Sequence, residues 1–266
     1  MPERLVVEAL RESADARGLR FESFSHGWIV RLSHGDRVAR VFGYDFELNS
    51  TTAAKIAGDK AATSTFLRDA GVPSVPHHLF LRSSLPEYTG PEGNWRRMLA
   101  LAEDLGWDLV CKANSGTGGQ HVYRVQTAAE LETASTAVFA AHHSLALAPF
   151  VAADAEYRVI LLDGDPLLVY EKVRDDGEWR HNLGLGGRAV DVTDDALSAR
   201  LAGIAAPALT AIGLRFASVD LIATGSDVVV LEVNSGVMME YYGGSSDERR
   251  RIAAAIYDRA VGAMFA

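Results

Sequence analysis

The chain has 266 residues, of which 48% are hydrophobic and 23% are charged, so it can bury one large core or two to three small ones. Its formal net charge of -9 argues against general binding to nucleic acid or to an anionic membrane surface, because both need clustered Lys and Arg. A single cysteine cannot form an internal disulfide, and no apolar run of about 20 residues is present, so we expect a cytoplasmic protein.

The first 50 residues predict one helix and one hairpin. Apolar residues at helical spacing favour a helix over 3–17 that ends at Gly18. Two β-like runs, 28–32 and 37–42, flank a His-Gly-Asp turn at 34–36, which is typical of a hairpin.

From residue 51 onward, helices and strands are both expected. A helix is predicted over 51–70, and the Pro-containing segment 72–76 that follows cannot continue it. The other helices are expected at 94–105, 127–142, 194–212 and 246–263. Strands are expected at 79–82, 108–113, 121–125, 145–150, 158–162 and 167–173 and in a last hairpin over 215–234, whereas 174–188 is expected to be a loop. Since the strands form hairpins and no internal repeat is present, the predicted fold class is α+β with mainly antiparallel pairing.

Three oxygen-bearing side chains are expected to converge on the last hairpin. Glu232 and Asn234 share one face of a strand, and the turn at 224–227 brings Asp220 within about one residue of facing Glu232. Two uncompensated carboxylates raise each other's pKa, and a divalent cation removes that penalty, Mg²⁺ being the usual one beside phosphates, with Mn²⁺ as a substitute. The hairpin therefore indicates a metal site, although two unrelated, partly exposed strand acids would give the same pattern.

A glycine-rich loop follows the lysine that ends the run 109–112. Glycines at 113–119 let backbone N–H groups approach an anion, and Lys112 adds a positive charge, which together suit a polyphosphate. The loop is not a Walker P-loop or a dinucleotide fingerprint, because a strand and not a helix follows it. A simple turn is the alternative, and the other basic candidates are ambiguous when taken singly: Lys60, Arg158 and Lys172.

Taken in order, six motifs resemble the ATP-grasp superfamily, and most closely its branch of ribosomal S6-type glutamate ligases, cyanophycin synthetase and the ATP-grasp half of bifunctional glutathione synthetases. The resemblance covers about residues 45–262. The motifs are AGDKAAT (57–63) with LRDAGVPSVP (67–76), VCKANSGTGG (110–119), EYRV (156–159), RHNLGLGG (180–187), FASVD (216–220) and LEVNSG (231–236).

The resemblance implies an ATP-grasp fold, in which two α+β subdomains clasp ATP. Residues 51–150 would form the first subdomain with the glycine-rich lid loop, and residues 151–266 the second with the metal-binding hairpin. Only a helix and a hairpin, residues 1–50, precede them, where relatives commonly have a full α/β domain. Part of the substrate-binding wall is therefore expected to be missing or supplied by a neighbouring subunit.

The resemblance also implies roles for individual residues. Two lysines would bind phosphates, the lid loop would cover them, the segment after 148 would contact adenine, and an acid would take the ribose hydroxyls. The residues expected to contact ATP are Lys60, Lys112, Ser115, Gly116, Gly118, Gly119, Pro149, Phe150, Val151 and Glu156. Mg²⁺ would be held by Asp220, Glu232 and Asn234. Catalytic positions near the γ-phosphate and the activated carboxylate would be Arg158, Lys172 and Asn182, where positive charge stabilises the transferring phosphoryl group.

The activity implied is ATP-dependent ligation. A carboxylate attacks the γ-phosphate to give ADP and an acyl phosphate, and an amine then displaces phosphate. The expected partners are a small-molecule carboxylate and an amine, such as an amino acid, a small peptide or a natural-product intermediate, and a homodimer is left open. The alternatives are an ATP-grasp kinase that phosphorylates a hydroxyl, and a non-catalytic nucleotide-binding or partner-dependent subunit.

Three positions depart from the family pattern. Pro149 stands where an acid is usual, and Ser218 where one branch often has Arg, so Arg158 is expected to supply the charge there. Ser235 and Gly236 replace the usual Pro-Gly, and the tail that follows is expected to shape the acceptor site, with core packing of its two methionines as the alternative.

Overall fold

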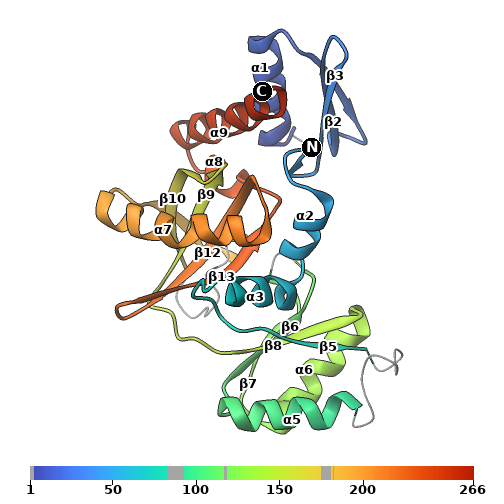
Figure 1. Ribbon diagram of the computed structural model, residues 1–266, viewed down its shortest axis with the longest axis vertical. Helices are drawn as coiled ribbons and strands as arrows, with labels where there is room; N and C mark the ends of the chain where they lie inside the picture. The colour runs from blue at the N-terminus through green and yellow to red at the C-terminus, as the bar shows by residue number, and fades with distance from the viewer. Residues whose placement is uncertain (1–2, 83–92, 117–118, 175–180, 182) are drawn as a thin grey trace.

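The computed structural model describes residues 3–82, 93–116, 119–174, 181 and 183–266. These residues form three β-sheets, of four, five and four strands, with helices packed against them (Figure 1). Every ladder between neighbouring strands of the described chain is antiparallel, which confirms the α+β class. None of the helices in these ranges combines the length and the apolar character needed to cross a membrane.

The N-terminal sheet follows helix α1 (Leu5–Arg17), which ends at Gly18 in the left-handed region with φ 63°. Its strands lie in chain order and are β1 (Arg20–Phe24), β2 (Ile29–His34), β3 (Arg37–Phe42) and β4 (Asp45–Phe46). The predicted helix and the β2–β3 hairpin are confirmed, whereas β1 and β4 were not predicted. Neither shows a strand pattern, because β1 has more polar than apolar residues and β4 has only two residues.

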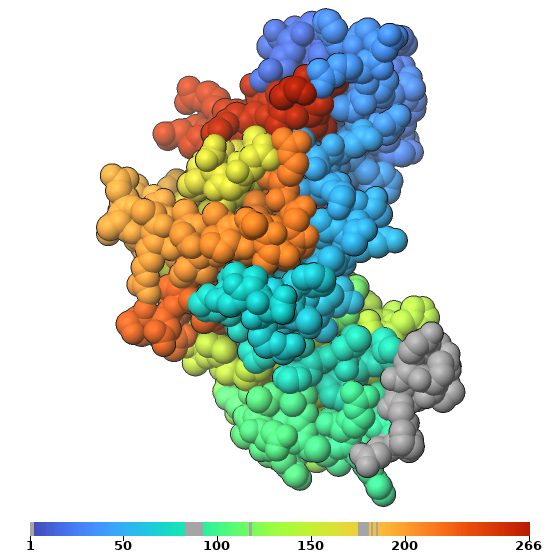
Figure 2. Space-filling model, in the orientation of Figure 1, coloured from blue at the N-terminus to red at the C-terminus, as the bar shows by residue number. Residues whose placement is uncertain are grey.

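The N-terminal sheet packs on the other end of the chain. Helices α8 (Glu240–Gly243) and α9 (Asp247–Phe265) lie against α1, and the blue and red surfaces meet at the top of Figure 2. One hydrophobic core joins these elements to the C-terminal sheet, with members that include Leu10, Leu32, Phe46, Ile160, Phe216, Tyr242 and Tyr257. The first 50 residues are therefore part of a continuous core.

The C-terminal sheet carries the candidate metal hairpin. Its strands are β9 (Ala155–Leu162), β10 (Asp165–Val173), β11 (Arg188–Asp191), β12 (Phe216–Thr224) and β13 (Asp227–Asn234), with the short 3-10 helix η1 (Leu183–Leu185) before β11. The spatial order is β11-β10-β9-β12-β13, and helix α7 (Asp195–Ile212) packs on one face. Both predicted hairpins are confirmed. The segment 174–188 was expected to be a loop. Its last residue, Arg188, is instead the first residue of β11, which pairs with β10.

The single helix predicted over 51–70 is wrong, because the segment forms α2 (Thr51–Ala57) and α3 (Lys60–Asp69). Asp59 starts the second helix, since its carboxylate accepts a 2.8 Å hydrogen bond from the backbone N–H of Ala62. Both helices pack on α7 and β13. The predicted subdomain 51–150 groups α2 and α3 with the middle sheet, but both helices contact the C-terminal sheet. The division at residues 50 and 150 stays a prediction.

The middle sheet, at the bottom of Figure 1, completes the fold. Its strands are β5 (His78–Leu81), β6 (Leu109–Ala113), β7 (Val122–Val125) and β8 (Ser144–Pro149), in the order β5-β8-β6-β7. Helices α5 (Gly93–Leu105) and α6 (Ala128–Ala141) share its hydrophobic core. All six elements lie close to their predicted bounds, and the glycine-rich loop joins β6 to β7.

Candidate active site

Charged side chains line one face of the C-terminal sheet. The apolar neighbours of Asp220 along β12 point into the core beneath α7, so Asp220 itself faces the opposite side. On that side it pairs with Arg158 of β9 and with Glu232 of β13. Ser218 and Asn234 form the next pair on the same face. The convergence of Asp220, Glu232 and Asn234 expected from the hairpin is therefore what the ladder shows.

A buried ion network surrounds Asp220. Arg158 donates from Nε and Nη2 to the two carboxylate oxygens of Asp220, each at 2.7 Å. The ammonium group of Lys172 lies 3.2 Å from Asp220 Oδ2 and also pairs with Glu156. Burial raises the pKa of Asp220, but Arg158 and Lys172 outweigh burial and hold that pKa at about 2. Both oxygens of Asp220 are thus engaged by cations of the chain itself.

Lys60 links three separate parts of the chain. Its ammonium group lies 3.3 Å from Glu232 Oε1 and donates a 2.9 Å hydrogen bond to the backbone carbonyl of Gly116. Asn114 holds the start of α3 in place, because its backbone and side-chain oxygens accept from the N–H groups of Lys60 and Ala61 at 3.1 and 3.0 Å. Helix α3, the glycine-rich loop and the β12–β13 hairpin, the candidate metal hairpin, therefore meet at Lys60.

Lys112 approaches the same carboxylate from the middle sheet. Only 8% of the residue is exposed. Burial lowers the pKa of Lys112 to about 8, although Glu232 acts in the opposite direction, and the charge of Lys60 lowers it further. Two lysines from different elements, Lys60 of α3 and Lys112 of β6, thus lie near the Glu232 carboxylate.

The other residues predicted to contact ATP follow β6 and β8. Ser115 and Gly116 are exposed at the end of β6, and Gly119 has φ 72°, a conformation that favours glycine. Gly118 lies outside the described residues, as does the predicted catalytic residue Asn182.

The segment after β8 passes from the middle sheet to the C-terminal sheet. Pro149 ends β8, and the N–H of Phe150 donates a 2.8 Å hydrogen bond to the carbonyl of Asp108. The Arg124 guanidinium lies 3.8 Å from the centre of the Phe150 ring. Val151 packs in a small apolar cluster that contains residues from both sheets.

The charged residues of α3, β6, β9, β10, β12 and β13 described above form one site, the charged cleft, and buried polar atoms without partners lie next to it. Six such side-chain atoms occur among the described residues, namely His77 Nε2, Asn94 Oδ1, Asn114 Nδ2, His181 Nε2, Ser218 Oγ and Asn234 Nδ2. Four of them lie next to the charged residues described above. Asn114 belongs to the glycine-rich loop, His181 follows β10, and Ser218 and Asn234 form a pair on β12 and β13. Since buried polar groups are normally paired, these atoms are positions that ordered water or a polar ligand would satisfy.

The charges also fit an anionic nucleotide with a divalent cation. Four cations, Lys60, Lys112, Arg158 and Lys172, surround three acids, Glu156, Asp220 and Glu232. No cluster of three His, Cys, Asp or Glu that could hold a metal by itself occurs in the described ranges. A metal at this site would therefore need the amide oxygen of Asn234 and phosphate oxygens besides the carboxylates, which is the donor set that Mg²⁺ accepts.

Two residues of this cleft were missed from the sequence. Asn114 lies inside a motif, but nothing in the motif shows that it bonds to α3. His181 also lies inside a motif, at 180–187, but it becomes a candidate only through its burial and its position beside Lys172.

The chain itself covers the far end of the charged face. Ile160 and Phe216 lie on that face and are buried by the N-terminal sheet and α9. The tail after β13 is tied to β4, because Ser235 Oγ donates a 2.8 Å hydrogen bond to Asp45 Oδ1. Met239 is fully buried in this core, so for this residue core packing is correct. The short N-terminal part thus covers this end of the sheet face, and the expected gap in the substrate-binding wall stays a prediction.

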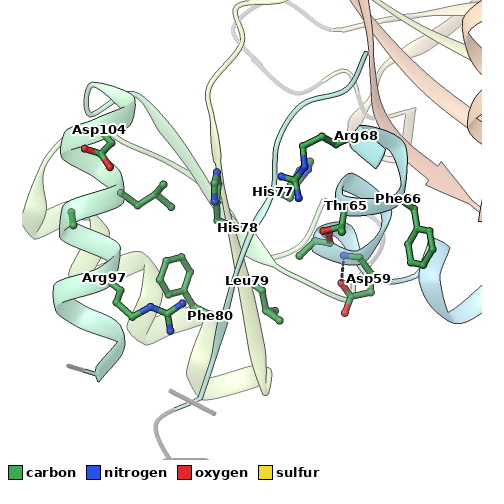
Figure 3. A pocket seen from close by; sticks show the side chains of 14 residues that line it. Asp59, Thr65, Phe66, Arg68, His77, His78, Leu79, Phe80, Arg97 and Asp104 are labelled. Atoms are coloured by element: carbon green, nitrogen blue, oxygen red, sulfur yellow. Dashed lines mark hydrogen bonds between the residues drawn. The ribbon is translucent and has the colours of Figure 1, made fainter. Parts of the chain in front are cut away.

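A separate groove of about 750 Å³ lies between α3 and α5, with β5 at its base (Figure 3). Its lining includes Arg68, His77, His78, Phe80 and Arg97. None of the residues assigned above to ATP, metal or catalysis lines it, so we treat it as distinct from the charged cleft.

Comparison with known proteins places these observations in a family. Residues 97–256, more than half of the chain, match the RimK-like ATP-grasp domain. The probable alpha-L-glutamate ligase of Shewanella halifaxensis is 32% identical over 137 residues, which are 51% of this chain and 29% of that protein. The glutathione synthetase of Parasynechococcus marenigrum is 32% identical over 137 residues, 49% of this chain and 43% of that protein. The chain thus spans less than half the length of these relatives.

Solved structures agree on the fold. A D-alanine–D-alanine ligase from Bacillus anthracis has a TM-score of 0.62 at 19% identity, over 82% of this chain and 69% of that chain. A bifunctional glutathione synthetase from Pasteurella multocida has a TM-score of 0.59 at 17% identity, over 96% of this chain and 44% of that chain. The architecture is the ATP-grasp fold, and the chain belongs to the RimK-like ATP-grasp domain family.

Proposed function

We propose that the protein is an ADP-forming ligase that uses ATP to join a carboxylate to an amine. The observation that carries the proposal is the convergence of four cations and three acids on the cleft where α3, the glycine-rich loop and the metal hairpin meet. Such a cleft suits a reaction in which negative charge moves from a nucleotide to a substrate carboxylate.

Lys60 and Lys112 would bind the phosphates of ATP. The lid loop around Ser115, Gly116, Gly118 and Gly119 would cover the phosphates, and Glu156 would accept from the ribose hydroxyls. Backbone groups of Pro149, Phe150 and Val151 would contact adenine, since this segment links the two sheets.

Mg²⁺, or Mn²⁺ in its place, would be held by Asp220, Glu232 and Asn234 together with phosphate oxygens. When bound, the metal would neutralise charge on the phosphates. Because Arg158 and Lys172 now occupy the oxygens of Asp220, these two cations would turn toward the substrate when the metal arrives.

Arg158 and Lys172, with Asn182, would orient the substrate carboxylate toward the γ-phosphate. Attack by a carboxylate oxygen releases ADP and leaves an acyl phosphate, and attack by the amine then releases phosphate. The relatives include a probable alpha-L-glutamate ligase and a glutathione synthetase, so amino acids and small peptides are the first substrates to test.

The test is an ADP-release screen that pairs carboxylates with amines in the presence of Mg²⁺. Glu232→Ala should abolish turnover, because it removes a carboxylate that both lysines and the metal would share. Glu12→Ala, on the exposed face of α1, is the matched control and should turn over like the wild type. Retained activity in Glu232→Ala would contradict the site.

Transfer of phosphate to a hydroxyl is the second candidate, because the same ATP site serves both reactions. Hydroxylamine separates the two. A hydroxamate that depends on the carboxylate substrate supports ligation through an acyl phosphate, whereas a stable phosphoester and no hydroxamate would establish a kinase.

A further inference from the structure

His181 is a buried histidine to which the proposed reaction gives no role. It is 8% exposed, and its Nδ1 lies 2.9 Å from the backbone carbonyl of Lys172. A carbonyl oxygen only accepts hydrogen bonds, so Nδ1 carries the proton, and Nε2 of the neutral ring presents a lone pair. That Nε2 is buried and has no hydrogen-bond partner among the described residues.

His181 lies beside the Lys172–Glu156 ion pair. The residue whose carbonyl holds His181 is Lys172, and the ammonium group of Lys172 pairs with Glu156. His181 is also near enough to Glu156 that a positive charge on its ring would lower the pKa of that carboxylate. Two hydrogen-bond acceptors, a carboxylate and an imidazole nitrogen, thus lie near each other, and the cleft leaves the second without a donor.

The chemistry of the missing partner follows from this pair. Phosphate oxygens and carboxylates accept hydrogen bonds, so neither can satisfy the lone pair of Nε2. Two hydroxyl groups on neighbouring carbons would give one donor to each acceptor. In a nucleotide these groups are the ribose 2′- and 3′-hydroxyls.

We propose that His181 Nε2 accepts a hydrogen bond from one ribose hydroxyl of ATP, next to Glu156, and that this contact makes the protein prefer ribonucleotides over deoxynucleotides. The inference rests on the proposed function, since it requires ATP in this cleft. It adds a specificity-determining residue to that site.

The test is a calorimetric comparison of ATP, 2′-deoxyATP and 3′-deoxyATP with Mg²⁺ and without any carboxylate or amine substrate. The wild type should bind ATP about three- to tenfold more tightly than one of the two analogues, the effect expected of one hydrogen bond. His181→Asn keeps a donor near Nδ1 for the Lys172 carbonyl and removes the acceptor at Nε2. In this variant the ratio between the affinity for ATP and the affinity for that analogue should fall to about one. His181→Gln places an acceptor near the position of Nε2 and should restore part of the preference for ATP over that analogue.

His77 supplies a matched control. It is also 8% exposed, its Nδ1 lies 2.9 Å from the Val75 carbonyl, and its Nε2 has no partner in the part of the chain that the structure describes. It precedes β5 and lies by Lys112 and not by Glu156. His77→Asn removes the same kind of atom, so it should keep the wild-type ratio whatever it does to stability.

The outcomes separate this inference from the proposed function. If the wild type binds ATP and both analogues equally, or if His181→Asn weakens all three by the same factor, the ribose contact is refuted while ATP binding stands. If the wild type binds none of the three nucleotides, the proposed function fails as well.

Discussion

Arg158 and Asp220 face each other across β9 and β12 and are joined by two hydrogen bonds of 2.7 Å. The planar guanidinium matches the two carboxylate oxygens, which makes such a pair stronger than a single contact. Lys172 adds a third contact to the same carboxylate. Because the site is buried, Asp220 stays ionised only through these cations, which hold its pKa at about 2 against the effect of burial.

Replacing Arg158 by Met should remove a pH-dependent part of the stability. The pKa of Asp220 is about 2 in the folded protein and 3.8 in the absence of partners. Asp220 therefore contributes stability that is complete above about pH 4 and is lost as the pH falls toward 2. The contribution is about 2 kcal/mol. We expect Arg158→Met to be less stable at pH 7 and to lose less stability between pH 4 and 2, measured by urea unfolding at each pH. Arg215→Met, which breaks the exposed pair with Asp163, should nearly keep the wild-type profile.

Local features of the site could be predicted and distant ones could not. The turn at 224–227 predicted Asp220 within about one residue of Glu232, and the structure pairs the two directly because the register shifts between Asp220 and Leu221, a local irregularity that the strand pattern does not show. The Arg158–Asp220 pair joins residues 62 positions apart, and it depends on the order of strands in the sheet, which no local pattern contains. The break at Gly58 and Asp59 is a different case. A glycine followed by an N-capping residue was present in the sequence, but helix formers on both sides concealed it.

Binding of ATP should be accompanied by proton uptake at Lys112. Burial lowers the pKa of Lys112 to about 8 in the protein without ligands, and a nearby polyphosphate would raise it. Near pH 8.5 the ATP-bound protein should therefore carry more protons, whereas near pH 6 Lys112 is already charged and the uptake should vanish. Calorimetry in two buffers of different ionisation enthalpy measures the difference. Lys112→Met should abolish the proton uptake at pH 8.5, whereas Lys55→Met, at an exposed position of α2, should leave it unchanged. A wild type with no buffer dependence at pH 8.5 would show that Lys112 does not respond to the nucleotide.

Mg²⁺ alone should bind weakly, because Arg158 and Lys172 already occupy both oxygens of Asp220. We expect Mg²⁺ to leave the Tm nearly unchanged, and Mg²⁺ with ATP at about 100 times Kd to raise it by about 5 °C or more. In Glu232→Gln, most of the Mg²⁺-dependent part of this rise in Tm should be lost. Asp227→Asn, at the exposed start of the same strand, is the control. An equal rise with Mg²⁺ alone would mean that the two cations do not compete with the metal.

Glu240 should stabilise helix α1 from the far end of the sequence. Its carboxylate accepts from the N–H groups of Leu5 and Val6 at 2.9 and 3.3 Å, and Arg4 at the N-cap makes no side-chain cap. A carboxylate at this end also interacts favourably with the helix dipole. Glu240→Ala should lower the free energy of unfolding by about 1 to 2 kcal/mol, as loss of a cap does. Glu12→Ala, in the exposed part of α1, should change it by less than about 0.5 kcal/mol. Equal effects of the two changes would rule out a capping role for Glu240.

Two glycine-to-alanine substitutions should act in opposite directions. A Cβ on Gly243 would overlap with the side chain of Leu5 and lie 3.2 Å from Ala253 Cβ, so α8 could not stay in place between α1 and α9. We expect Gly243→Ala to cost about 1 to 3 kcal/mol. Gly203 lies within α7 and has nothing within 4 Å of the added atom. There alanine should stabilise by about 0.5 to 1 kcal/mol, because it restricts the unfolded chain and suits a helix. Urea unfolding of both variants measures the difference. If Gly243→Ala were neutral, the close packing of α8 between α1 and α9 would not contribute to stability.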